Sequence, residues 1–101
     1  MFQLVLQFAG WNPGSFDALV ALEEELISVI GSRGSVDGHD AGSGEANIFI
    51  LTELPREILR ACIPTLQQSS FTAFAAGYRD LESENYLRLW PPGDESTFTV
   101  K

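Results

Sequence analysis

Four side chains that could do chemistry fall within nine positions of the chain: Asp37, His39, Asp40 and Glu45. In an extended strand, Asp37 and His39 point to one face and Asp40 points to the other. Histidine and carboxylates suit zinc or manganese, so a metal site is one hypothesis for this stretch. The spacing matches no strong metal motif, and Ala41 breaks the pattern of an EF-hand loop. We therefore expect no metal and no other cofactor, and instead a glycine-rich hairpin turn in which Asp40 caps backbone N–H groups.

His39 is the only histidine of the chain. An unperturbed imidazole titrates near neutral pH and can act as a general base, and a neighbouring carboxylate could orient it. A small enzyme that uses His39 and Asp37 is therefore one hypothesis. No nucleophile motif accompanies the pair, because Ser43 lies between glycines without the strand-to-helix context of a nucleophile elbow. The residues favour a structural or solvent-exposed histidine and a domain without catalytic residues.

Glu23 is the second chemically odd position. On a helical wheel of residues 16–30 it falls near the middle of the apolar stripe, flanked by Phe16, Leu19, Ile27 and Ile30. A carboxylate there is either partly buried with a partner or lies at the margin of the helix and reaches water. We group Glu23 with the four residues above as a polar site.

The sequence predicts seven regular elements in the order β-α-β-β-α-β-β. Alternating or continuous apolar runs mark the strands, Ser15 and Gly31 bracket the first helix, and Pro55 opens the second, which Pro64 should kink or end early. The predicted ranges are 2–8, 16–30, 35–41, 48–51, a helix from 55, 71–78 and 86–90. Two right-handed β-α-β crossovers around a hairpin predict a ferredoxin-like α+β sandwich, with two helices on one face of an antiparallel sheet. We expect one domain over residues 1–101, in which the last strand is an addition to that fold and residues 92–101 form a tail or a short edge strand.

The stretch from Val36 to Ile50, which reads VDGHDAGSGEANIFI, is followed by Thr52 and Pro55, and the chain nears its end with Leu89-Trp90-Pro91. These segments resemble a family of small bacterial ferredoxin-like proteins without an established activity. The resemblance covers most of the chain by order of elements, but individual residues only at 36–55 and 86–91. It implies the same fold and a bacterial cytoplasmic origin, and it brings no catalytic residues.

Charge restricts the partners. With 14 acidic and 6 basic residues the formal net charge is −8, which repels nucleic acid and anionic membranes, so we expect neither as a partner. Cys62 is the only cysteine, residues 1–32 contain no Lys or Arg, and no apolar stretch near the start is long enough to span a bilayer. These features predict a cytoplasmic protein.

The last predicted strand carries a candidate partner surface. If its leucines face the helices, Tyr86, Arg88 and Trp90 lie together on the outer face of the sheet, beside Tyr78 of the adjacent strand. Tyr, Trp and Arg are enriched at interface hot spots. We expect this face to be covered by a second copy of the chain or by another protein. The alternative is that residues 92–101 fold back over it, with Phe98 and Val100 as the cover.

Taken as a sequence, the chain is best interpreted as a non-catalytic protein-interaction domain. One concrete version is an immunity-type or regulatory partner whose acidic surface covers a basic one. The first alternative is a small-ligand regulatory module of ferredoxin-like topology, and the second is the enzyme that uses His39 and Asp37. The fold cannot separate these classes, because it hosts many functions.

Overall fold

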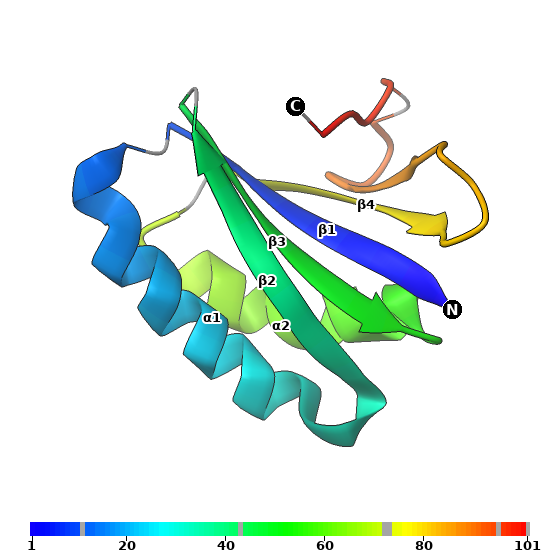
Figure 1. The fold of residues 1–101 in the computed structure, drawn as a ribbon, viewed down its shortest axis with the longest axis horizontal. Coiled ribbons are helices and arrows are strands. Elements are labelled where there is room, and N and C mark those ends of the chain that lie inside the picture. Colours follow the sequence, from blue (N-terminus) through cyan, green and yellow to red (C-terminus); the bar gives the residue numbers. More distant parts are fainter. Residues whose placement is uncertain (11, 43, 72–73, 95, 101) are drawn as a thin grey trace.

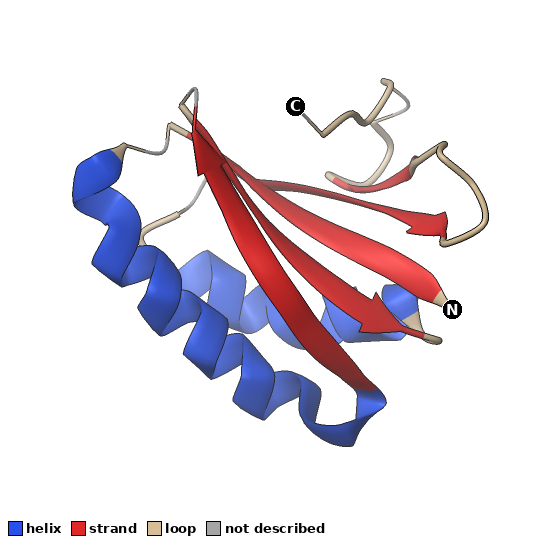
Figure 2. Ribbon diagram, in the orientation of Figure 1, coloured by secondary structure: helices blue, strands red, loops and turns tan. Residues whose placement is uncertain are grey.

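A computed structural model describes residues 1–10, 12–42, 44–71, 74–94 and 96–100. In these ranges a five-stranded sheet carries its two α-helices on one face, here called the helix face (Figure 1, Figure 2). Two short 3-10 helices flank α1. In chain order the elements are β1 (Phe2–Ala9), η1 (Pro13–Ser15), α1 (Phe16–Ile30), η2 (Gly31–Arg33), β2 (Gly34–Gly42), β3 (Glu45–Thr52), α2 (Pro55–Gln68), β4 (Phe74–Asp80) and β5 (Leu87–Trp90).

The strands lie in the order β2-β3-β1-β4-β5, and each neighbouring pair is antiparallel. This order confirms the predicted ferredoxin-like sandwich, with β5 added beside β4. The expected turn between β2 and β3 includes Ser43, and the expected start of β4 includes residues 72–73; these positions lie outside the described residues. Residues 91–94 and 96–100 contain no helix or strand.

The core lies between the helices and the sheet. Strand alternation turns Leu4, Leu6 and Phe8 of β1 to the helix face, where all three are fully buried. Val5, between them, is also fully buried although it points to the opposite face, here called the outer face. Both faces of β1 are therefore covered, although the helices lie on only one of them.

Helix α1 buries a narrower stripe than the wheel predicted. Its buried residues are Leu19, Leu22, Leu26 and Ile30, spaced by three and four positions. Phe16 and Ile27, expected within the buried half, are 46% and 52% exposed. That expectation was wrong because the apolar residues of α1 outnumber the positions that contact the sheet and α2.

The end of α1 is fixed by backbone hydrogen bonds. Gly31 has a φ of 58°, which favours glycine, and its N–H donates to the Ile27 carbonyl. The Arg33 guanidinium donates to the carbonyls of Val29 at 2.7 Å and Ile30 at 3.2 Å. This cation therefore satisfies the carbonyls left open at the helix C-terminus.

Helix α2 begins at Pro55 as expected but does not end early at Pro64, because it continues to Gln68. Proline removes one helical hydrogen bond and crowds the carbonyl four residues earlier. The apolar stripe of α2 includes Cys62 and Leu66, which are fully buried on either side of the proline. Packing of the apolar stripe of α2 stabilises the helical turn that Pro64 weakens.

No helix in the described ranges is both long enough and apolar enough to cross a membrane.

Cys62 is fully buried within the core. Burial raises the pKa of its thiol from 9.0 to about 11, although Arg33 acts in the opposite direction. The rise lowers the thiolate fraction about a hundredfold at neutral pH, and the thiolate is the reactive form.

We therefore predict that folded protein reacts with a disulfide reagent such as DTNB at least about a hundredfold more slowly than protein unfolded in guanidinium. The absorbance of the released thiolate measures both rates. Comparable rates for folded and unfolded protein would contradict the burial of Cys62.

Candidate functional site

His39 lies on the helix face of β2 and pairs with a carboxylate from another element. It stands opposite Ile48 in the sheet register, and its Nδ1 lies 3.0 Å from Glu23 Oε2 of α1. The Phe16 ring packs edge-on at 5.9 Å from the His39 ring centroid. The side chains of His39 and Glu23 are 28% and 18% exposed. The pair therefore ties α1 to the edge strand while remaining open to water.

A bulge in β2 explains why His39 meets Glu23. The register shifts between Val36 and Gly38, so Asp37 has no partner residue in β3. Gly38 has a φ of 115°, a conformation that other residues rarely adopt. Regular alternation, which would put Asp37 and His39 on one face, does not hold across the bulge. The carboxylate that orients His39 is Glu23, not Asp37.

The remaining two residues of the predicted polar site lie on the outer face. Asp40 stands opposite Asn47 in the register, and Glu45 accepts a hydrogen bond from Asn47 Nδ2 at 3.4 Å. The structure thus divides the set between two faces of the sheet. In the described part of the chain, no three His, Cys, Asp or Glu side chains are arranged to hold a metal ion.

The predicted partner surface is also divided between two faces. Trp90 stands opposite Ala76 on the helix face and stacks on Phe74, with ring centroids 5.4 Å apart. Tyr78, opposite Leu4, lies on the same face. The placement of Trp90 and Tyr78 on the outer face was therefore wrong. A register shift between Ala76 and Gly77 leaves one extra residue in β5, Leu89, and this shift breaks the alternation.

Tyr86 and Arg88 do lie on the outer face, where the tail covers them. Phe98 is 3% exposed and packs 5.4 Å from the Tyr86 ring, with the Arg88 guanidinium 5.4 Å from its centroid. Arg88 also donates to the carbonyls of Ser96 at 3.0 Å and Thr97 at 3.2 Å. The alternative in which the tail covers this face is confirmed for Phe98, and Val100 is half-buried.

Two further contacts hold the tail. The Gln7 amide donates to the Thr99 carbonyl at 2.8 Å. The Asp94 carboxylate accepts hydrogen bonds from the hydroxyl and the N–H of Ser96, which lower the pKa of Asp94 below its ordinary value. The sequence indicated the cover but not these polar contacts, of which the first joins β1 to the tail and the second lies within the tail.

Exposed carboxylates line one edge of the molecule, and others lie elsewhere, at Glu53, Glu57, Asp80, Glu82, Glu84 and Asp94. Helix α1 lies beside β2, the edge strand (Figure 1), and the two elements carry five exposed carboxylates. We call this surface the acidic edge; its residues are Asp17, Glu24, Glu25, Asp37 and Asp40. Arg33 is the only Lys or Arg before residue 56, and its guanidinium caps α1. The negative charge of the acidic edge is therefore largely uncompensated.

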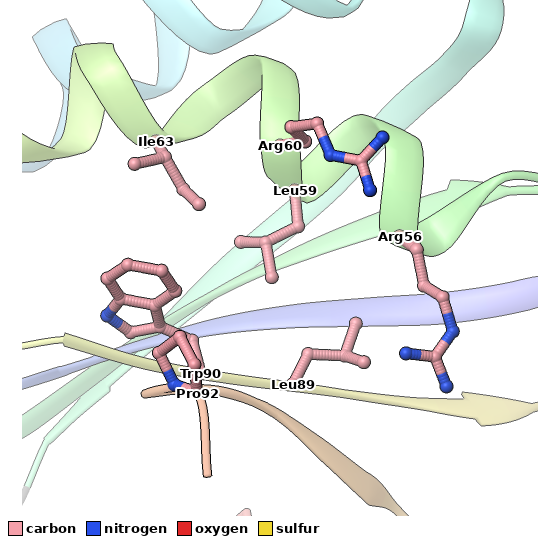
Figure 3. A pocket seen from close by; sticks show the side chains of 7 residues that line it. All are labelled: Arg56, Leu59, Arg60, Ile63, Leu89, Trp90 and Pro92. Carbon is pink, nitrogen blue, oxygen red and sulfur yellow. The ribbon is translucent and has the colours of Figure 1, made fainter.

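A groove between α2 and β5 is a concave feature that the sequence did not predict. It encloses about 250 Å³ and has an apolar lining with two arginines at its margin. Figure 3 shows side chains of α2 facing side chains of β5 across it, with both guanidinium groups toward one end. These residues are Arg56, Leu59, Arg60 and Ile63 of α2, and Leu89 and Trp90 of β5. The only sequence signal was the spacing of Arg56 and Arg60, which puts them on one helical face.

No protein-family model, no curated protein and no solved structure matches this chain. What the structure supports of the resemblance noted in the sequence is a small α+β fold with a five-stranded antiparallel sheet.

We predict a weak coupling between Glu23 and His39. In a double-mutant cycle of Glu23→Gln and His39→Gln, the coupling free energy should be about 0.2–1 kcal/mol, because both side chains are partly exposed. Urea denaturation of the four proteins measures it. The control cycle replaces Glu23→Gln with Glu24→Gln. The Glu24 carboxylate faces water, so this cycle should give no coupling free energy. Equal coupling free energies in the two cycles would show that the pair of Glu23 and His39 makes no specific contribution to stability.

We also predict that Phe98→Ala lowers the free energy of unfolding by about 2–4 kcal/mol, because a buried ring is lost from the outer face. Leu87→Ala, at an exposed position of β5, serves as the control and should change it by no more than about 0.5 kcal/mol. Denaturant titration measures both. A small effect of Phe98→Ala would contradict the packed position of the tail.

Proposed function

We propose that this chain is a non-catalytic protein-interaction domain whose acidic edge binds a basic surface of another protein. The observation that carries the proposal is the set of five exposed carboxylates on α1 and β2, beside which the one arginine, Arg33, is engaged by backbone carbonyls. Complementary charge steers association and selects against wrong partners. An immunity-type or regulatory partner that covers a basic surface is the concrete form of this role.

The geometry of β2 favours a different protein over a second copy. β2 is an edge strand, and an open edge invites pairing with another strand. Its bulge at Asp37 interrupts the regular pairing pattern. Two acidic edges brought together would also repel each other, whereas a basic partner would neutralise them. The acidic edge is therefore suited to a basic partner rather than to self-association.

The contacts of His39 favour binding over catalysis. Its Nδ1 is engaged by Glu23, and the Phe16 ring packs against its imidazole. Among the described residues, no serine, threonine or cysteine is hydrogen-bonded to His39, so the geometry of an activated nucleophile is not formed. The similarity to small bacterial ferredoxin-like proteins without an established activity adds no catalytic role.

A pair of charge-reversed variants tests the proposal. Glu24→Lys with Asp40→Lys alters the acidic edge, while Glu82→Lys with Glu84→Lys alters the exposed turn between β4 and β5 by the same net charge. We predict that a basic protein captured from the native cell by the wild type is also captured by the turn variant. Its affinity for the edge variant should be at least about tenfold lower, because several complementary charges are reversed.

Calorimetric titration with the captured protein gives the three affinities. Equal weakening by both variants would show that only net charge matters, and undiminished binding by the edge variant would place the interface elsewhere. Either result would overturn the proposed role of the acidic edge.

A further inference from the structure

The five arginines of the chain fall into two groups by their partners. Arg33, Arg79 and Arg88 each donate to backbone carbonyls and hold turns or the tail in place. Arg56 and Arg60 make no such bond to the described residues. Among the described residues, Arg56 has one hydrogen bond, from Nη2 to the Tyr78 phenol oxygen at 3.4 Å, and its Cζ lies 5.5 Å from the centroid of that ring. These two guanidinium groups therefore have unused donors.

The lack of carboxylate partners is notable in a chain with 14 acidic residues. Within the described ranges, no carboxylate oxygen lies within 4.0 Å of a nitrogen of Arg56 or Arg60, since the ion pairs there involve Met1, His39 and Arg88. A guanidinium offers five donors in a rigid fork that matches a carboxylate. Arg56 and Arg60 place two such forks on successive turns of α2, with Glu53 and Glu57 nearby.

The groove beside these arginines has an apolar interior. Leu59 and Ile63 of α2 face Leu89 and Trp90 of β5 (Figure 3). Trp90 is held by its stacking on Phe74, with the two ring planes only 5° apart. A fixed aromatic wall beside a charged end fits a ligand that has a flat apolar body and an anionic group.

A second hollow of about 400 Å³ is lined by the same two arginines. Glu53 and Glu57 line it, and Glu53 pairs with the N-terminal ammonium group at 3.2 Å. Their charge disfavours an anion there. The residues that line the groove beside Trp90 include no carboxylate, so an anion is best accommodated on that side.

We propose that the groove between α2 and β5 binds a small organic carboxylate with an aromatic body. The carboxylate contacts Arg56 and Arg60, and the ring lies between Ile63 and Trp90. The volume of about 250 Å³ is below the range of drug-sized pockets, so the ligand is small. This site is separate from the acidic edge, and its occupation does not depend on a protein partner.

Two probes that differ only in charge test the site without altering the protein. Indole-3-acetate carries the carboxylate, and indole-3-acetamide is its neutral counterpart. We expect saturable chemical-shift changes at amides of α2 and β5 in ¹⁵N-HSQC spectra, with at least about tenfold higher affinity for the acetate. Equal affinities, or shift changes confined to other elements, would overturn the proposal.

Variants then identify the charged group. Arg60→Gln should weaken indole-3-acetate binding about tenfold and leave indole-3-acetamide unchanged, because only the charged contact is lost. Ser32→Glu changes the net charge by the same amount at an exposed site beside α1 and should have little effect. Equal weakening by both variants would show that the probe responds to overall charge and would contradict a site at Arg60.

Discussion

The register shift between β4 and β5 determines which side chains of β5 pack on each face of the sheet. Because Leu89 is an extra residue between Arg88 and Trp90, Leu89 and Trp90 both pack against the core on the helix face while Arg88 points to the outer face. The groove beside α2 and the anchor for the tail both follow from this. Opposite the shift, Gly77 leaves room for the Phe98 ring, since a Cβ there would lie 2.7 Å from two ring carbons. Strand β5 therefore contributes to the packing on both the helix face and the outer face of the sheet.

Much of the fold could be predicted from the sequence, because it depends on local patterns and on chain order. Apolar alternation in β1, the apolar run at Ile48–Leu51 and the helix signals at Pro55 and Gly31 were enough to give the ferredoxin-like arrangement. The side-chain groupings could not be predicted, because both bulges change which face a residue occupies. Asp37 and His39 were grouped by alternation and are separated by one bulge, and Trp90 moves to the helix face through the other. Glu23 was identified as unusual, but its partner depends on how α1 packs across β2.

The two proposed binding surfaces lie in different parts of the fold. The half formed by α1 and β2 presents carboxylates, and its two basic side chains, Arg33 and His39, are engaged internally. The half formed by α2 and β5 presents two guanidinium groups beside apolar surface. The net charge of −8 is a sum over the whole chain and does not reveal the two guanidinium groups at the groove. The two proposed binding surfaces therefore differ in charge, in shape and in the class of partner they can accept.

The placement of Trp90 on the helix face is the feature to test first, because the groove and the covered outer face both require it. A NOESY spectrum of the protein in solution reports which aromatic rings lie close together. Placement of Trp90 on the helix face predicts cross-peaks between Trp90 and Phe74 there, and between Phe98 and Tyr86 on the outer face. Cross-peaks between Trp90 and Phe98, with none between Trp90 and Phe74, would place Trp90 on the outer face and contradict it.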